Sequence, residues 1–200
     1  MLAYTKTKAM PTLMARSFYT LAFVGALAAA TALAAGSNFR VSSVQPRAND
    51  HSLRLTGNAE LGLTPKVEEA LGNGIPLEFV IDVRLYRERA LWWDETIESW
   101  RLRRQLYYHA LSGQYLIGAE SGSMRAREGY GSLTEALRQL GSLDDVVLPL
   151  NAALAADSDY RVGVRVLLDI EALPPLLRPM AYTSRAWDLN SGWTTWKIQR

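Results

Sequence analysis

The residues of this sequence that could do chemistry are arginines and tryptophans, which crowd along one predicted β-hairpin. Guanidinium groups bind phosphates and carboxylates bidentately, so this cluster could hold an anionic lipid, a polysaccharide or an acidic protein partner. A charged outer sheet face, in which acidic side chains neutralise the arginines, explains the same cluster without a ligand. The candidate ligand- or partner-binding residues are Arg84, Arg87, Arg89, Trp92, Trp93 and Arg103.

Catalytic and metal-binding side chains form no recognisable motif. His51 and His109 are the only histidines, and isolated histidines are more often solvated or hydrogen-bonded than bound to metal. The chain has no cysteine, which excludes disulfides, thiolate metal sites and cysteine nucleophiles. We therefore expect no enzymatic activity, no metal and no cofactor.

Carboxylates are plentiful along the same hairpin. Glu78, Asp82 and Glu88 fall on the strand face that alternation sends outward, so we expect them to be exposed and to pair across strands with Arg101 or Arg103. A hydrolase built on two carboxylates is a remote alternative, because nothing in the sequence indicates a pocket around them.

The N-terminal residues are typical of a secretory signal. Three basic residues precede an uncharged apolar run, residues 18–35, and this run contains the small-x-small site Ala32-Leu33-Ala34. We expect residues 1–34 to be a signal peptide and the protein to be periplasmic. An uncleaved inner-membrane anchor formed by residues 18–35 is the alternative, since 18 residues is just under the length of about 20 that spans a bilayer.

The net charge of the exported part argues against nucleic acid as a partner. Of the 22 basic residues, three lie in the first 34 positions, so 19 basic and 20 acidic residues remain, a net charge of −1. The calculated pI of about 8.9 therefore comes from the targeting segment. Nucleic-acid binding needs clustered positive charge on the folded domain, and we do not expect it.

Period-two alternation predicts the strands that must position the candidate residues. Ile75 to Arg89 alternates between apolar and polar side chains, with Phe79 on the core face, and Tyr160 to Ile170 alternates with Val164 on the core face. Gly57 interrupts another strand, where we expect a bulge or close packing. The expected strands are 39–44, 53–61, 75–89, 100–111, 114–118 and 160–170, with a possible short strand in 144–150.

Capping signals predict two short helices. Thr64-Pro65 begins one that ends at Gly72, and Ser132 with Glu135 forms a capping box for one that ends at Gly141. The expected connections are a turn at 90–99, a two-residue hairpin at 112–113, an exposed loop at 120–131, and an extended, non-helical segment at 174–179. The expected fold is a β-rich α+β domain over residues 35–200: an antiparallel β-sheet or sandwich with two short helices.

Longer motifs on these elements carry a family resemblance. They are Phe79 to Arg89, Trp92-Trp93-Asp94, Leu106 to Ser112, Gln114-Tyr115, Trp187-Asp188-Leu189 and Ser191-Gly192-Trp193. Over residues 38–198 the chain resembles the proteobacterial domain of unknown function family 4390. The resemblance implies an exported envelope protein without an assigned activity, and it provides no catalytic residues. It also hints at a membrane or envelope protein of the sensor histidine kinase type as partner.

Two functions from different classes follow. The first is an accessory or ligand-sensing module that acts on a membrane or envelope protein. The second is a periplasmic protein that binds anionic lipid or polysaccharide. A deep apolar cavity would favour the lipid, whereas a flat exposed patch would favour a protein partner.

We predict that the exported protein is cut after Ala34, because a small-x-small site follows an uncharged apolar core. Intact-mass measurement of the periplasmic protein should give the mass of residues 35–200. A mass that includes residues 1–34 would contradict the prediction.

Overall fold

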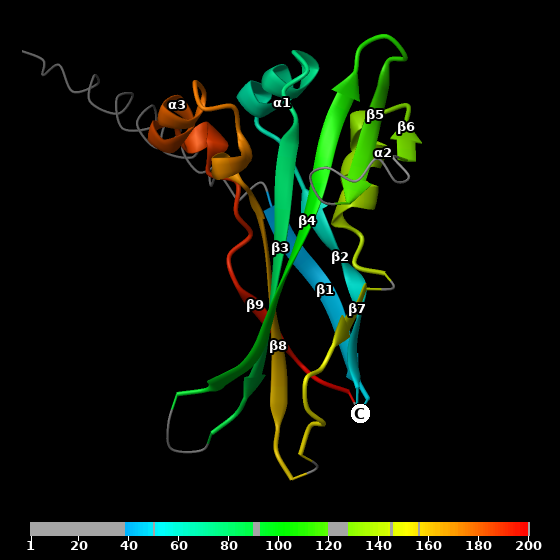
Figure 1. The fold of residues 1–200 in the computed structure, drawn as a ribbon, viewed down its shortest axis with the longest axis vertical. Helices are drawn as coiled ribbons and strands as arrows, with labels where there is room; N and C mark the ends of the chain where they lie inside the picture. The colour runs from blue at the N-terminus through cyan, green and yellow to red at the C-terminus, as the bar shows by residue number, and fades with distance from the viewer. Residues whose placement is uncertain are drawn as a thin grey trace, which may run out of the picture. The chain divides into compact units, whose positions relative to one another are not determined.

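Two antiparallel sheets build the domain (Figure 1). The computed structural model describes residues 39–49, 51–89, 93–119, 128–144, 146–155 and 157–199, and residues 37–200 form one compact unit. The smaller sheet has the order β1-β2-β7 and the larger sheet the order β6-β5-β4-β3-β8-β9. The strands are β1 (Phe39–Ala48), β2 (Ser52–Leu61), β3 (Leu77–Arg87), β4 (Glu95–His109), β5 (Gln114–Ala119), β6 (Glu128–Tyr130), β7 (Val146–Pro149), β8 (Tyr160–Leu168) and β9 (Thr194–Lys197).

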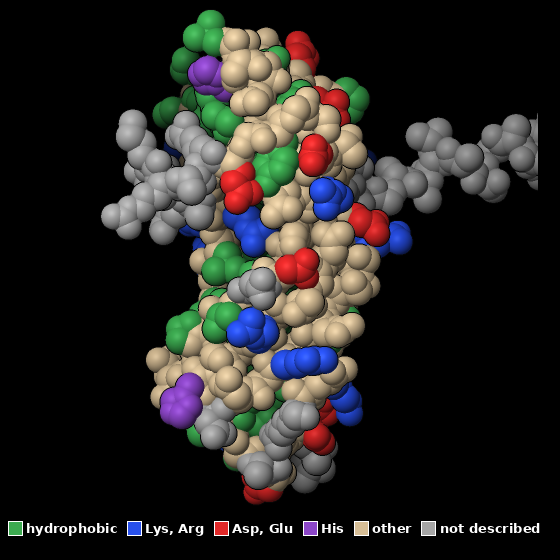
Figure 2. Space-filling view, turned by 90° about the vertical axis from the view of Figure 1, so that its right-hand side faces the viewer, with side chains coloured by type: hydrophobic (Ala, Val, Ile, Leu, Met, Phe, Trp, Pro, Cys, Tyr) green, Lys and Arg blue, Asp and Glu red, His purple; other side chains and the backbone are tan. Residues whose placement is uncertain are grey.

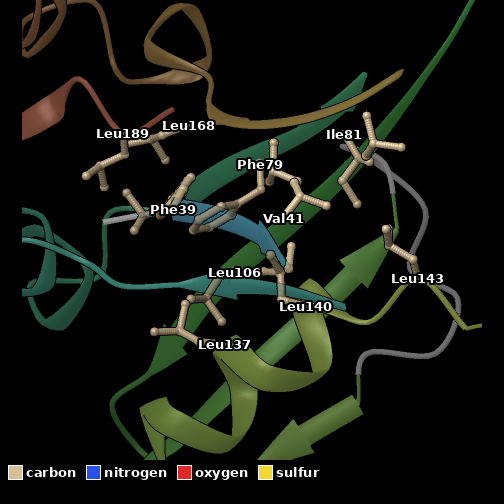
Figure 3. Packing of buried hydrophobic residues seen from close by; sticks show 14 of the residues in the cluster. Phe39, Val41, Phe79, Ile81, Leu106, Leu137, Leu140, Leu143, Leu168 and Leu189 are labelled. Carbon is tan, nitrogen blue, oxygen red and sulfur yellow. The ribbon is translucent and has the colours of Figure 1, made fainter. Parts of the chain in front are cut away.

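The two sheets pack face to face around an apolar core. Phe39 of β1 stacks on Phe79 of β3, with ring centroids 5.8 Å apart and planes inclined by 28°. Both rings are fully buried, and Figure 3 shows them between the two sheets with leucines of α2 (Leu133–Gly141) below. The predicted core positions Phe79 and Val164 are both confirmed as buried.

Both predicted helices are present and are capped as expected. The Thr64 hydroxyl accepts a hydrogen bond from the Val67 amide at the start of α1 (Pro65–Gly72), and the Ser132 hydroxyl accepts one from the Glu135 amide at the start of α2. These bonds satisfy amides that have no partner inside the helix. Helices this short are held by packing rather than by propensity.

An arginine of the large sheet fixes the other end of α2. Arg104 lies on the inner side of β4, and its Nη1 donates to the carbonyl oxygens of Leu140 and Ser142, each at 2.6 Å. These carbonyls close the C-terminus of α2, where a positive charge is favoured by the helix dipole. Burial lowers the pKa of Arg104 because it disfavours the positive charge. The two carbonyl oxygens at the end of α2 offset this cost.

The small sheet is fastened to the large sheet at both of its edges. At the β1 edge, the Gln199 amide donates to the Pro46 carbonyl at 3.0 Å. At the β7 edge, the Trp100 indole donates to the Pro149 carbonyl at 3.2 Å, and just after β7 Glu98 accepts the amide of Asn151 at 2.8 Å. Close packing joins the strands within the sheet, because a Cβ on Gly57 would lie 2.1 Å from the Ser43 carbonyl oxygen. The expectation of close packing at Gly57 is therefore confirmed.

The central hairpin differs from the prediction in its strand limits. β3 ends at Arg87, and its pairing with β4 shifts register between Leu85 and Tyr86. β4 begins at Glu95 rather than at residue 100, because Arg87 pairs with Glu95 and extends the ladder. The turn after β4 spans the four residues 110–113, not two.

The C-terminal third contains elements that the sequence did not indicate. The segment expected to be extended at 174–179 ends in a helix, α3 (Arg178–Thr183), because Pro179 occupies its first turn, where no amide hydrogen is needed. Single-turn helices η1 (Ile170–Ala172) and η2 (Arg185–Trp187) flank it. β6 lies within the expected loop 120–131, and β9 is the last strand of the large sheet.

None of the described helices is long and apolar enough to cross a membrane. The predicted signal peptide or anchor, residues 1–34 and 18–35, lies outside the described residues.

We predict that Phe79→Ala lowers the free energy of unfolding by about 3–5 kcal/mol, because it removes a fully buried ring and one half of the stack with Phe39. Val164→Ala should cost less. The measurement is a urea denaturation curve, with Thr96→Ala on the exposed side of β4 as control, which should change stability by less than about 0.5 kcal/mol. A Phe79→Ala curve that overlays the control would show that this stack does not support the fold.

Candidate functional site

Two of the candidate residues, Arg84 and Arg103, lie on the face of the large sheet that points away from the small sheet, which we call the outer face. In β3 the inner face carries Phe79 and Ile81, so Glu78, Asp82 and Arg84 point to the outer face. Antiparallel pairing places Arg101 of β4 and Arg165 of β8 directly beside Asp82, one on each side. A row of charges therefore crosses three strands.

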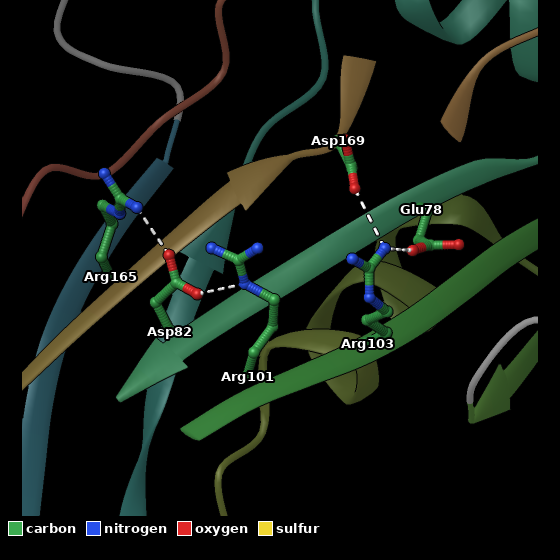
Figure 4. Close-up of polar contacts among 6 residues, drawn as sticks. All are labelled: Glu78, Asp82, Arg101, Arg103, Arg165 and Asp169. Carbon is green, nitrogen blue, oxygen red and sulfur yellow. Dashed lines mark hydrogen bonds and ion pairs between the residues drawn. The ribbon is translucent and has the colours of Figure 1, made fainter. Parts of the chain in front are cut away.

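Asp82 is the buried centre of this row. The residue is only 6% exposed, and its carboxylate accepts hydrogen bonds from Arg101 Nε at 2.8 Å and Arg165 Nη2 at 2.5 Å (Figure 4). Burial raises the pKa of Asp82, but the hydrogen bonds and charges of the two arginines together outweigh burial, so the pKa lies below its ordinary value. Asp82 is thus held ionised.

A second cluster lies further along the same face. Arg103 Nη1 contacts the Glu78 carboxylate and also Asp169 Oδ2, the latter at 3.1 Å (Figure 4). Glu78 is 5% exposed. The hydrogen bond that Arg103 donates to Glu78 raises the pKa of Arg103. This arginine is therefore engaged by two carboxylates.

The predicted partners of Glu78 and Asp82 are confirmed, but their predicted exposure is wrong. Both carboxylates were expected to be solvated, and both are buried. The reason is that β3 is flanked on both sides, and the long side chains of Arg101, Arg103 and Arg165 lie across it. The charged neighbours themselves cover this part of the outer face.

Trp193 covers a different part of the outer face. The guanidinium carbon of Arg84 lies 4.4 Å from the centre of the Trp193 ring, and that of Arg165 lies 4.8 Å from it. These are cation–π distances. We call Arg84, Arg165, Gly163, Tyr86 and Trp193 the Trp193 site.

Gly163 makes room for the tryptophan. A Cβ at this position would lie 2.9 Å from the Tyr86 ring and 3.3 Å from the Trp193 ring, so any side chain would displace one of them. The preceding segment is fixed to β8, since the Ser191 amide donates to the Val166 carbonyl and the Val166 amide donates to the Ser191 hydroxyl, both at 2.9 Å. Trp193 is therefore held in place by backbone pairing.

The Trp193 site has hydrogen-bond donors without acceptors. Arg84 is exposed and has no acidic partner among the described residues. Arg165 uses one terminal nitrogen for Asp82, and its buried Nε has no hydrogen-bond partner in the described part of the chain. A phosphate or carboxylate beside Trp193 would supply an acceptor to the exposed guanidinium of Arg84.

The other candidate residues lie at the tip of the β3–β4 hairpin. Arg87 and Arg89 both pair with Glu95, and the hydrogen bond from Arg87 is the main cause that lowers the pKa of Glu95. Trp93 is 92% exposed, whereas Trp92 lies outside the described residues. The structure thus divides the predicted cluster into the hairpin tip, the Trp193 site with Arg84, and the ion pairs of Arg103.

Two of the hollows lined by described residues lie away from the Trp193 site. One, of about 260 Å³, lies beside η1, α3 and η2, and the other, of about 330 Å³, lies between the outer side of the small sheet and α2. Neither separates the two sheets. Within the described ranges no three His, Asp or Glu side chains converge as a metal site.

A comparison with protein families identifies the family of the chain. A family model described as Domain of unknown function (DUF4390) matches residues 36–197. The chain belongs to this family. No curated protein and no solved structure matches it significantly. The DUF4390 match covers every strand and helix of the two-sheet domain, including the Trp193 site.

Of the five members of the Trp193 site in this DUF4390 domain, only Arg84 was among the predicted candidate residues. Tyr86, Gly163, Arg165 and Trp193 were not. One signal was present, since a glycine within an otherwise bulky alternating strand marks the close approach of another group. Which group approaches Gly163 was not readable, because Trp193 reaches it through the register of the C-terminal segment.

We predict that the ion pairs of Asp82 make stability fall in acid. Because the pKa of Asp82 in the folded protein lies below its ordinary value of 3.8, these pairs stabilise the fold above about pH 4, and the stabilisation is lost as pH falls below that value. Asp82→Asn should cost about 1–3 kcal/mol at pH 7 and flatten the acid limb. Chemical denaturation between pH 7 and pH 2.5 measures both effects.

Glu95→Gln is the matched control for Asp82→Asn, because Glu95 also pairs with two arginines but is much more exposed. It should change stability far less. Equal effects of the two variants would show that burial of Asp82 in the central strand has no special importance.

Proposed function

We propose that this DUF4390 chain is a non-enzymatic binding module of the cell envelope, exported to the periplasm, and that it holds an acidic segment of a protein partner at the Trp193 site. The observation that carries the proposal is the pair of guanidinium groups at Trp193, of which Arg84 lacks an acidic partner among the described residues. Exported envelope location rests on the N-terminal signal.

The chemistry of the site favours recognition of a carboxylate or phosphate. A planar guanidinium presents paired N–H donors, and an adjacent aromatic ring keeps water from one side of it. Arg165 is already oriented by Asp82, so part of the site is pre-organised before a ligand binds. An acidic side chain that reached Arg84 would gain charge-assisted hydrogen bonds at small entropic cost.

A binding role fits the carboxylates better than acid–base catalysis. A general acid at neutral pH needs a raised pKa, whereas the pKa values of Asp82 and Glu95 are lowered by their arginines. These carboxylates act as counter-ions that hold the arginines in position.

A protein partner is favoured over a lipid by the shape of the site. Trp193 and the two arginines lie on the outer face of a sheet, and neither the hollow beside η1 nor the hollow beside α2 is lined by them. A flat surface with an aromatic residue and arginines is typical of protein–protein contacts. An anionic lipid or polysaccharide is the alternative ligand.

We predict that a photo-crosslinking residue at Ser99 captures the partner in living cells. Ser99 is exposed and lies directly opposite Arg84 in the ladder. Arg84→Ala should lower the yield of adduct about tenfold or more, and Arg84→Lys should restore only part of it, because lysine replaces the charge but not the paired donors. Mass spectrometry of the adduct identifies its chemical class.

Two controls separate the Trp193 site from the rest of the surface. Arg87→Ala with Arg89→Ala removes two arginines that Glu95 already neutralises, and should leave the yield unchanged. A crosslinker at Glu60, exposed on the small sheet, should give no specific adduct. Gly163→Ala should reduce capture, since its methyl group displaces Trp193 or Tyr86.

Full capture by a folded Arg84→Ala variant would exclude the Trp193 site. Loss of capture only in the Arg87 and Arg89 double variant would assign binding to the hairpin tip. A lipid or glycan adduct would replace the protein partner by the alternative ligand.

A further inference from the structure

One end of the domain gathers the helices and the exposed apolar side chains. In Figure 1 the upper end carries α1, α3 and the turn between β4 and β5. The pairing of Leu77 with Leu106 places the start of β3 beside the end of β4, and the Thr64 hydroxyl donates to the Ala186 carbonyl at 2.8 Å, which ties the start of α1 to η2. We call this region the helical end.

Large apolar side chains project from the helical end. Leu111, in the β4–β5 turn, is 95% exposed and Leu176, just before α3, is 93% exposed. Met180 and Tyr182 of α3 are 42% and 58% exposed. Figure 2 shows apolar side chains beside a histidine at this end, above a surface on which acidic and basic groups are interspersed. Among the described residues, six large apolar side chains are exposed, and four of them are at this end.

The polar groups between these side chains have hydrogen-bond or ion-pair partners. The Tyr182 hydroxyl donates to Glu171, and Arg178 lies 4.0 Å from the same carboxylate. Arg178 Nε also donates to the Leu173 carbonyl at 2.8 Å. A tyrosine ring with its hydroxyl bound to a polar group suits the boundary between lipid tails and headgroups.

The chain itself connects the helical end to an apolar segment. β1 begins at Phe39, which pairs with Leu61 three residues before Thr64, so the first described residue also lies at the helical end. The uncharged run ends at residue 35. Four residues span at most about 14 Å when fully extended, so a bilayer that holds residues 18–35 lies within that reach of Phe39.

We propose that the helical end is a membrane-contact surface, with Leu111, Leu176, Met180 and Tyr182 resting in the headgroup region of the bilayer. The tip of the β3–β4 hairpin, at the opposite end of β3 and β4, then points away from the membrane. The contact needs no bound partner at the Trp193 site. Four side chains without a lipid anchor give weak, reversible attachment.

The absence of native cysteine allows a direct test. Full-length variants Leu111→Cys and Leu176→Cys, each labelled with an environment-sensitive fluorophore, are mixed with vesicles of phosphatidylethanolamine and phosphatidylglycerol. Trp93→Cys is the matched control, because Trp93 is equally exposed but lies at the hairpin tip. Circular dichroism checks that each labelled variant is folded.

The expected result is a blue shift at positions 111 and 176, with quenching by brominated lipid several-fold stronger than at position 93. Equal quenching at all three positions, or quenching confined to position 93, would overturn the proposal. Protection of positions 111 and 176 in cells without any response to vesicles would also overturn it, since a protein would then cover the surface. Arg84→Ala should not alter the quenching pattern, so this result and the crosslinking result stand or fall separately.

Discussion

The charge of Asp82, buried in the central strand, is the constraint on which the large sheet depends. A buried carboxylate is tolerated only when it is paired and hydrogen-bonded, and Arg101 and Arg165 supply both conditions from the two flanking strands. The pairing therefore links β4, β3 and β8 through side chains as well as through the backbone ladder. A shift of either neighbour by one residue would turn its arginine to the other face and leave Asp82 unpaired.

The same constraint connects the fold to the Trp193 site. Arg165 donates to Asp82 through one nitrogen, and its guanidinium carbon lies 4.8 Å from the centre of the Trp193 ring. The residue that balances the buried charge therefore also forms part of the proposed binding surface. Gly163, two residues earlier on the same face of β8, allows the tryptophan to approach. One row of side chains thus both supports the core and presents hydrogen-bond donors on the outer face.

The two proposed surfaces lie on different parts of the domain and have opposite chemistry. The helical end presents leucine, methionine and tyrosine side chains, whereas the outer face presents arginines around one tryptophan. A domain that rested on a membrane by its helical end would keep the outer face of the sheet accessible from the side. A partner with an acidic segment close to the membrane would then be within reach of the outer face, as the proposed accessory role requires.

The sequence by itself determined most of the local structure, because alternation, capping residues and prolines act over a few neighbours. It predicted the β-rich class, the caps at Thr64 and Ser132, the core position of Phe79 and the pairing of Glu78 and Asp82 with arginines. Only the tertiary structure decided the burial of those carboxylates, since burial depends on which strands flank β3 and how far their side chains reach. It also decided that Arg84 meets Trp193, more than a hundred positions away, and that Arg87 and Arg89 meet Glu95. Strand order and register set these contacts, and neither is written in any short stretch of residues.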